Sequence, residues 1–189
     1  MTRAETVQLT ELLADDAPPA WPAIRDAVRA AERRGVRTLS LPAPAPDEPP
    51  APVEATTLAA AVLRATTELR VVVPLDPARV APYNAARILA TLAHLAPGRV
   101  LLADAGTGPE WADYRAAIDH LWHSFPPEAI IADRATGRYL DPAALPGGGY
   151  AGSHHRVGGP LNLPTPPGPP LGRWPAADHA ADHDKKVPR

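Results

Sequence analysis

Histidines in the last third of the chain are the first residues whose types suggest chemistry. His154 and His155 are adjacent, and His179 and His183 are four residues apart, a spacing that puts two side chains on one helix face. Imidazoles and carboxylates are metal ligands, and carboxylates stand beside the second pair, at Asp178, Asp182 and Asp184. A polar terminal stretch is more typical of a solvated tail, so we predict no metal site.

Two short motifs nearby raise the phosphate-binding and hydrolase alternatives. The run 147–149 is all glycine, but it does not open a helix after a strand, as a phosphate-binding loop does. Ser153 and His154 are adjacent, yet no acid stands near them in the sequence to complete a nucleophilic triad. We therefore expect neither a phosphate loop nor a hydrolase site in this segment.

The composition of the chain excludes several classes of protein. With 19 basic and 21 acidic residues and no basic run, the net charge of −2 argues against a dedicated nucleic-acid binder. The 189 residues include no cysteine, which excludes disulfides and thiolate metal sites. The first residues lack the apolar region of a signal peptide, and no apolar run reaches the roughly 18 residues of a membrane helix. We expect a cytoplasmic protein without a membrane span.

Any site must be positioned by ordered elements, and the clearest of these lie between Pro82 and Leu102. Proline suits the first turn of a helix, and Pro97 with Gly98 ends one. The apolar run that starts at Val100 indicates a strand covered on both faces. Between the prolines, apolar residues recur at the spacing of one helix face: Ala85, Ile88, Leu89, Leu92 and Leu95.

The same reasoning predicts alternating strands and helices along most of the chain. We expect strands at 6–9, 36–41 and 69–75 and from residue 99, and helices at 21–34, 53–67, 82–96 and 111–125. Such alternation favours an α/β fold with a parallel sheet, either open and doubly wound or part of a (β/α) barrel. The 26 prolines cluster at 42–52 and 160–175, which indicates long surface loops, and 15–22 is also expected to be a loop.

Two blocks of sequence resemble one protein family. The first is Pro-Tyr-x-x-Ala-Arg-x-x-Ala-x-Leu-x-x-Leu-x-x-Gly-Arg, from Pro82 to Arg99. The second has Ala-Asp-Arg-x-x-Gly at 132–137, followed by Gly-Pro-Leu-Asn-x-Pro at 159–164. Both are similar to the bacterial luciferase-like flavin-dependent monooxygenases, in the branch of the nitrilotriacetate and dibenzothiophene sulfone monooxygenases. The resemblance covers roughly residues 21 to 170.

The resemblance implies a fold, a cofactor and an activity. Family members are (β/α)8 barrels that use oxygen and reduced FMN, which a separate flavin reductase supplies. Because such a barrel typically needs about 250 residues, the chain would form a partial, TIM-type barrel, the N-terminal half of the family's fold. We expect about four parallel strands with flanking helices and a Pro/Gly-rich C-terminal extension. The predicted divisions are a half-barrel at 1–128, an irregular excursion at 129–173 and a disordered tail at 174–189.

By family position, the candidate cofactor-binding residues are Tyr83, Asn84, Asp104 and Tyr114. For the two tyrosines, packing at helix starts is an equal alternative. Other family positions have lost their polar groups: the acid after the second strand falls near Ala43, the hydroxyl pair after the third strand near Asp76 and Pro77, and an aspartate of the helix at Ala93. The resemblance therefore implies an incomplete or degenerate flavin site.

Two functions follow as hypotheses. The first is a luciferase-like monooxygenase with a partner that completes the barrel. The second is a non-catalytic barrel half that binds or regulates a full-length monooxygenase. Four parallel strands leave two edges with unpaired backbone groups, which the 129–170 excursion or another chain must cover. We therefore also expect either an obligate oligomer, most simply a homo-oligomer, or a marginally stable monomer.

Overall fold

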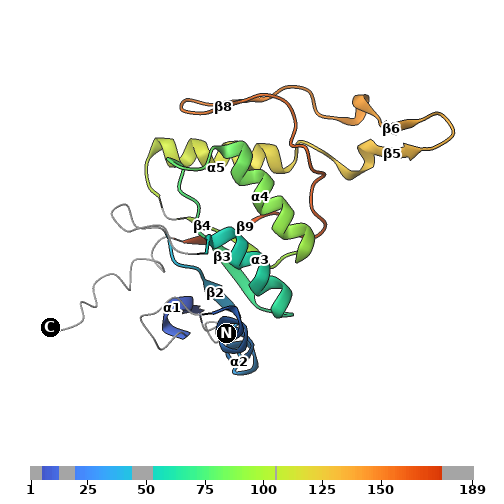
Figure 1. Cartoon of the computed structure of the whole chain (residues 1–189). Coiled ribbons are helices and arrows are strands. Elements are labelled where there is room, and N and C mark those ends of the chain that lie inside the picture. Colours follow the sequence, from blue (N-terminus) through green and yellow to red (C-terminus); the bar gives the residue numbers. More distant parts are fainter. Residues whose placement is uncertain (1–5, 13–19, 44–52, 105, 176–189) are drawn as a thin grey trace. The chain divides into compact units, whose positions relative to one another are not determined.

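A computed structural model describes residues 6–12, 20–43, 53–104 and 106–175 of the chain. Their main feature is a five-stranded sheet in which all paired strands are parallel, in the order β1-β2-β3-β4-β9 (Figure 1). The strands are β1 Thr6–Gln8, β2 Thr38–Ser40, β3 Arg70–Val73, β4 Val100–Asp104 and β9 Gly172–Pro175. The predicted α/β class with parallel strands is confirmed.

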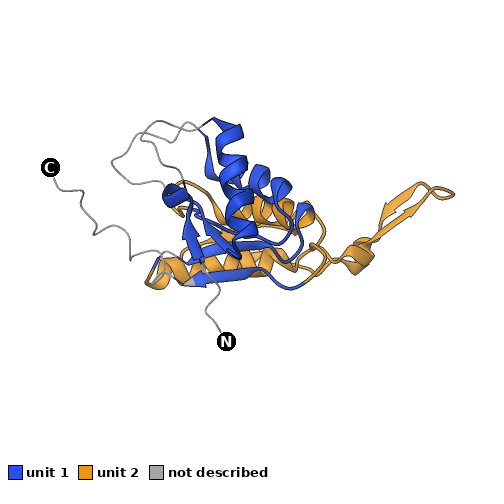
Figure 2. Ribbon diagram, turned by 90° about the horizontal axis from the view of Figure 1, so that it is seen from below, with its two compact units in different colours: residues 1–75, 95–106, 169–189 blue, residues 76–94, 107–168 orange. Residues whose placement is uncertain are grey.

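The chain divides into two compact units, each drawn from several segments (Figure 2). Unit 1 comprises 1–75, 95–106 and 169–189 and contains the sheet. Unit 2 comprises 76–94 and 107–168. The domain boundaries that the sequence predicts after residues 128 and 173 stay a prediction.

In unit 1, helices cover one face of the sheet. That face carries Leu39, Val71 and Val73, whose side chains are fully buried. Helix α3 (Ala55–Ala65) packs on β3, and α2 (Trp21–Arg33) packs on α3. Both helices are amphipathic, and their buried residues follow the helical period: Ile24, Val28 and Ala31 in α2, and Leu58, Ala59, Val62 and Leu63 in α3. The short α1 (Leu9–Leu12) contacts β1 and α2.

The opposite face of the sheet forms a second apolar cluster. Val72, Leu101 and Ala103 are buried there, and Trp174 of β9 packs against them. A Cβ atom at Gly172 would overlap the Leu101 side chain, so this strand position needs glycine to pair beside β4. The two clusters give the sheet an apolar layer on both sides, as the continuous apolar run of β4 predicts.

Unit 2 contains α5 (Pro109–Trp122), all of α4 (Pro82–Leu95) except Leu95, and the excursion that follows them. Two antiparallel hairpins lie in the excursion: β5 (Ile130–Asp133) with β6 (Arg138–Leu140), and β7 (Tyr150–Ala151) with β8 (Arg156–Val157). The short 3-10 helices η1 (Pro127–Ala129) and η2 (Pro142–Ala144) flank the first hairpin.

Three sequence expectations need correction. The loop predicted at 15–22 overlaps the helix predicted at 21–34, and the helix is correct at Trp21 and Pro22: Trp21 begins α2, because proline in the first turn starts a helix rather than ending one. Leu9 begins α1 and does not extend β1. Trp174 and Pro175 lie in β9 rather than in a tail, and β9 covers the edge of β4, which we had expected the 129–170 excursion or another chain to cover. The rest of the predicted tail lies outside the described residues.

The described helices are all too short or too polar to cross a membrane.

Candidate functional site

The carboxyl ends of the strands in unit 1 are where a barrel of this type places its site. These ends offer few hydrogen-bond donors. Pro74 directly follows β3, Pro42 follows β2 by two residues, and Pro175 ends β9 opposite Asp104 of β4. Proline has no backbone N–H, and the next residue after Pro42 is Ala43. The described ends therefore combine donor-poor backbone with one carboxylate, at Asp104.

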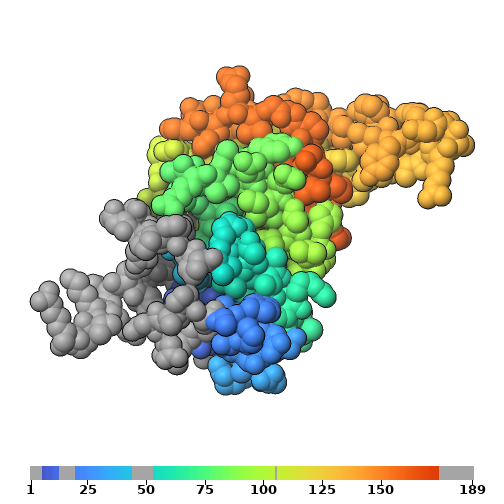
Figure 3. Space-filling model, in the orientation of Figure 1, coloured from blue at the N-terminus to red at the C-terminus, as the bar shows by residue number. Residues whose placement is uncertain are grey.

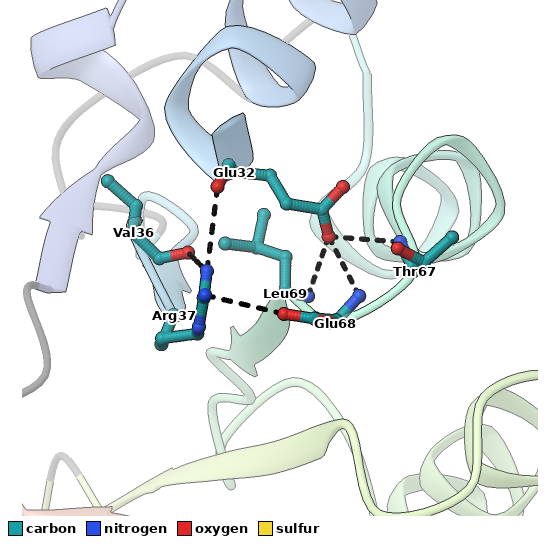
Figure 4. A network of polar contacts seen from close by, with 6 residues as sticks. All are labelled: Glu32, Val36, Arg37, Thr67, Glu68 and Leu69. Carbon is teal, nitrogen blue, oxygen red and sulfur yellow. Dashed lines mark hydrogen bonds and ion pairs between the residues drawn. The ribbon is translucent and has the colours of Figure 1, made fainter. Parts of the chain in front are cut away.

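The amino ends of the same strands carry a dense polar network instead (Figure 4). One carboxylate oxygen of Glu32, at the end of α2, accepts hydrogen bonds from three consecutive backbone N–H groups just before β3: Thr67 at 3.0 Å, Glu68 at 2.7 Å and Leu69 at 3.0 Å. Partial burial raises the pKa of Glu32, but these three donors and the charge of Arg99 outweigh it and hold the pKa below its ordinary 4.5.

Arg99, just before β4, completes this amino-end network. Its guanidinium donates to the carbonyls of Leu63, Thr66 and Leu69 at 2.9–3.2 Å and to the Thr66 hydroxyl at 2.7 Å. Burial lowers the pKa of Arg99, and the negative charge of Glu32 opposes that shift. The Gly-Arg pair that ends the first family motif therefore ties α3 to β3 and β4. Polar groups at the amino ends of barrel strands serve stability rather than catalysis.

Three predicted cofactor-binding residues lie in unit 2. Tyr83, half-buried, and Asn84, exposed, occupy the first turn of α4. Tyr114 of α5 is fully buried, stacks on Trp111 at 5.5 Å between ring centroids, and donates its hydroxyl to the carbonyl of Val80 at 2.9 Å. Burial, and then the nearby charge of Asp76, raise the pKa of the Tyr114 hydroxyl. In this structure the Tyr114 hydroxyl is used for packing α5 against the segment that precedes α4.

The fourth predicted residue, Asp104, is the last residue of β4 and belongs to unit 1, where it is half-buried. Of the four candidates, Tyr83, Asn84 and Tyr114 thus belong to the same unit. Their role as flavin contacts stays a prediction.

Asp113 of α5 is a polar residue that sequence reasoning missed. Its carboxylate accepts hydrogen bonds from the backbone N–H groups of Ser153 (3.2 Å), His154 (2.9 Å) and His155 (2.6 Å) and from the Tyr150 hydroxyl (2.6 Å). The Tyr150 hydrogen bond, which outweighs the opposing effect of burial, and the three backbone donors lower the pKa of Asp113 from 3.8 to about 2. The signal available in the sequence was an acidic residue between Trp111 and Tyr114, in the helix predicted at 111–125.

Asp113 also bears on the hydrolase alternative, because it is the acid that the sequence around Ser153 lacks. The Ser153 hydroxyl lies 2.9 Å from Nδ1 of His154. Asp113, however, binds backbone N–H groups and not the imidazole of His154. A nucleophilic triad needs the acid to orient the histidine ring. The arrangement is a loop anchor, and it does not support a hydrolase.

The Gly-Pro-Leu-Asn-x-Pro block fastens the end of the excursion to the helices of unit 2. The backbone N–H of Leu161, which is buried, donates to the Ser124 hydroxyl at 2.8 Å. Thr165 donates from its N–H and its hydroxyl to the Phe125 carbonyl, and its hydroxyl also contacts the Trp122 carbonyl. The block therefore has a structural role here, at the C-terminal end of α5.

The described residues contain no group of three or more histidine, aspartate or glutamate side chains that would hold a metal ion. His179 and His183 lie outside the described residues.

A sequence model of the family described as luciferase-like monooxygenase matches residues 4–123, more than half of the chain. This chain belongs to the luciferase-like monooxygenase family. The matched residues include all the strands of the sheet except β9, together with helices α1 to α5.

Curated relatives of this luciferase-like chain come from the predicted branch. It is 37% identical over 148 residues to a subunit of pristinamycin IIA synthase from Streptomyces pristinaespiralis, covering 76% of this chain and 53% of the relative. It is 29% identical over 140 residues to nitrilotriacetate monooxygenase component A of Aminobacter aminovorans, covering 64% of this chain and 31% of the relative. The chain thus spans about half, or less, of the length of these relatives.

Solved structures support the same fold. A long-chain alkane monooxygenase aligns with a TM-score of 0.66 at 19% identity, covering 80% of this chain and 43% of that one. The oxygenating constituent of 3,6-diketocamphane monooxygenase from Pseudomonas putida, solved in complex with FMN, aligns with a TM-score of 0.58 at 13% identity, covering 86% and 45%. The predicted partial-barrel fold is confirmed for this luciferase-like chain.

The strand ends of unit 1 provide a test of whether the described residues fit FMN. A phosphate needs N–H or cationic donors, and an isoalloxazine ring needs donors and acceptors along its polar edge. Pro42, Pro74 and Pro175 supply no N–H, and Asp104 adds negative charge. The described strand ends therefore do not fit an anionic flavin by themselves, and no catalytic step is assigned to them.

Proposed function

We propose that this chain is part of a flavin-dependent monooxygenase, an oxidoreductase that uses reduced FMN and molecular oxygen on a small organic substrate. The observation that carries the proposal is the family match over residues 4–123. The structural neighbour solved with FMN supports the choice of cofactor. A separate flavin reductase supplies the reduced cofactor, as the name "component A" of the nitrilotriacetate enzyme suggests for that relative.

In this proposal the described residues supply the scaffold, and most groups that hold the flavin phosphate come from elsewhere. The flavin activates oxygen, while the protein positions it and excludes water. Tyr83 and Asn84 are the candidates within α4, because their side chains are not fully buried, unlike Tyr114. Asp104 is the candidate at the end of β4.

Titration of the chain with reduced and with oxidised FMN, followed by flavin fluorescence, tests the proposal. We expect quenching that Tyr83→Phe and Asn84→Ala weaken. Arg87→Ala, an exposed change on the same helix, is the matched control and should leave binding unchanged. Absence of quenching at high micromolar flavin, both with the chain alone and after addition of a full-length family member, would end the enzyme hypothesis.

A second candidate function is a non-catalytic barrel half that binds or regulates a full-length luciferase-like monooxygenase. The specific observation in its favour is the donor-poor set of strand ends, where Pro42, Ala43 and Pro74 stand. The Streptomyces relative is itself named as one subunit of its synthase, which describes a protein that works within an assembly. In this alternative the degenerate site has lost the cofactor but kept the packing surfaces.

Co-purification with a full-length family member separates the two functions. The monooxygenase hypothesis predicts flavin turnover that depends on this chain, measured as substrate-dependent oxygen consumption. The regulatory hypothesis predicts a complex in which the partner's own turnover changes while this chain binds no flavin. Mixing the partner with Tyr83→Phe distinguishes them further, because only the first hypothesis makes turnover sensitive to that residue.

A further inference from the structure

One face of α2 in unit 1 carries a row of large side chains at a constant spacing. Trp21, Arg25, Arg29 and Arg33 recur every fourth residue along the helix, and residues four apart are neighbours on a helix surface. Trp21 is 40% exposed although it is a large apolar residue, and Arg29 and Arg33 are exposed as well. In the space-filling view, the segment of α2 forms part of the outer surface of unit 1 (Figure 3). We call these four residues the arginine ridge.

The ridge continues onto the end of α3, within the same unit. Nε of Arg29 donates to the carbonyl of Ala65 at 2.9 Å, which places Arg29 beside the end of α3, where Arg64 is exposed. The nearby acid of α2, Glu32, binds the backbone N–H groups of residues 67–69 (Figure 4). Its carboxylate is therefore engaged at the amino ends of the strands rather than with the ridge.

Most of the positive charge on this surface has no partner within the chain. Arg25 forms an ion pair with Asp26 at 2.9 Å. Arg29, Arg33 and Arg64 have no ion pair in the part of the chain that the structure describes. Like charges four residues apart slightly destabilise a helix, so α2 by itself gains nothing from this spacing. A cation in the last turn interacts favourably with the helix dipole, but that effect does not reach back to Arg25 or Arg29.

The composition of this surface favours a protein partner over a nucleic acid. Tryptophan and arginine are the residues that most often dominate the binding energy of protein interfaces, and lysine, which is depleted there, is absent from the ridge. Two carboxylates also stand nearby, Asp26 on α2 and Glu68 just after α3, and their side chains are 66% and 65% exposed. A protein can offer hydrogen-bond donors to such carboxylates, whereas a phosphate backbone repels them.

We propose that the arginine ridge, together with Arg64, docks an acidic helix of a partner protein. A helix with glutamate at every fourth position presents carboxylates at the same spacing as Arg25, Arg29 and Arg33, so that each arginine can meet one carboxylate. An apolar residue one turn beyond those acids contacts Trp21. Complementary charge of this kind raises the association rate and selects the partner more than it raises the affinity.

A synthetic acidic helix is the probe for this surface. The peptide is a labelled, alanine-rich helix of about 20 residues, with glutamate at every fourth position and a leucine one turn beyond the last. Fluorescence anisotropy should show binding to the whole chain at high micromolar concentration, weakened about tenfold between about 50 and 500 mM salt. A peptide of the same composition with its glutamates in one block should bind less tightly. Tighter binding of a double-stranded DNA of equal charge would overturn the proposal in favour of a nucleic acid.

Charge reversal at adjacent residues tests whether the ridge itself is the binding surface. Arg33→Glu should weaken peptide binding about tenfold, because it replaces an attraction with a repulsion. Arg34→Glu is the matched control: Arg34 is also exposed, but it lies about 100° around the helix from Arg33, on the side away from the ridge, so its effect should be under about threefold. Arg87→Glu on α4 should leave binding unchanged. Equal effects at residues 33 and 34, or no binding by the wild-type chain, would refute the proposal.

A rescue experiment separates a lost contact from a misfolded variant. A peptide with lysine in place of every glutamate should bind the Arg33→Glu chain more tightly than it binds wild type, and the opposite order would contradict the proposal. The variants are expected to fold, because Arg33 and Arg34 are exposed, and far-ultraviolet circular dichroism verifies this point. None of these measurements involves flavin, so their outcome is separate from that of the proposed function.

Discussion

Each unit contains one carboxylate that accepts hydrogen bonds from three consecutive backbone N–H groups. In unit 1, Glu32 collects those of residues 67–69 on a single oxygen, and Arg99 lies close enough to influence its charge. In unit 2, Asp113 collects those of residues 153–155 on two oxygens and adds the Tyr150 hydroxyl. The same arrangement thus has the Arg99 guanidinium nearby in unit 1 and a hydrogen bond from the Tyr150 hydroxyl in unit 2.

The difference shows what each anchor secures. Glu32 and Arg99 fix the entry to β3 and β4, two central strands of the sheet, so their loss should reach the whole fold of unit 1. Asp113 fixes a loop between two short strands on the surface of unit 2, so its loss should stay local. Three substitutions and a change to acid pH test this difference between the two anchors.

Replacement of Arg99 should have the largest effect. Arg99→Met removes donors to three carbonyls and a hydroxyl, and a charged hydrogen bond lost from a half-buried site is costly. We expect about 3 kcal/mol less stability to urea unfolding. Arg37→Met is the matched control: its hydrogen bonds to the Glu32 and Val36 carbonyls are long, at 3.5 and 3.3 Å, and its ion pair with Glu68 is exposed, so we expect a loss under about 1 kcal/mol. Similar losses in both variants would contradict the assignment of Arg99 to the network.

Gly152 should be the most sensitive position of the second anchor. A Cβ atom there would overlap a carboxylate oxygen of Asp113, so Gly152→Ala must displace the loop. We expect a local destabilisation of about 2 kcal/mol, read as faster hydrogen exchange of the amides at 153–155. Gly147→Ala, where a Cβ meets nothing within 4 Å, should leave exchange unchanged. Faster exchange throughout unit 1 as well would mean that the anchor is not local.

Neutralising Glu32 should have a moderate effect. Glu32→Gln keeps an oxygen acceptor but loses the charge that strengthens three hydrogen bonds, so we expect about 1 kcal/mol lower stability. The adjacent acid serves as a control: Glu68→Gln removes only an exposed ion pair. If both variants unfold at the same denaturant concentration, the N–H cluster does not depend on the charge of Glu32.

Acid should weaken both anchors, because a lowered carboxylate pKa in the folded state makes stability fall as the pH falls. Both folded-state pKa values lie below the ordinary values of 4.5 for Glu32 and 3.8 for Asp113. Their stabilisation is therefore complete above those values and is lost as the pH falls, in the case of Asp113 through about 2. Asp113→Asn should flatten the stability curve below pH 3.8, and Glu32→Gln should flatten it below pH 4.5. Unchanged curves in the variants would contradict these shifts.

The regular elements of the fold were predictable because their apolar residues repeat at the period of a helix or strand. The helix predicted at 82–96 is observed as Pro82–Leu95, and the strand predicted from residue 99 as Val100–Asp104. The hairpins β5–β6 and β7–β8 were not predicted, because strands of two to four residues are too short to show a period. Strand β9 has four residues, so its residue Trp174 was assigned to the predicted tail.

The candidate site, too, was predictable only in the parts that short-range sequence patterns specify. The sequence indicated the family from two motifs and placed Tyr83 and Asn84 at the start of a helix, where the structure has them. It could not indicate that the Tyr114 hydroxyl binds the Val80 carbonyl, because residues 34 positions apart become neighbours only after folding.

The sequence by itself determined the alternation of strands and helices, the family and the absence of cysteine chemistry. These follow from residue types and short-range spacing, which the chain displays before it folds. Only the tertiary structure decided that β9 pairs with β4, that Glu32 and Asp113 accept hydrogen bonds from consecutive backbone N–H groups, and that residues 130–140 form a hairpin. Those features join segments distant in the sequence, and their energies depend on burial and on hydrogen-bond geometry that no local pattern specifies.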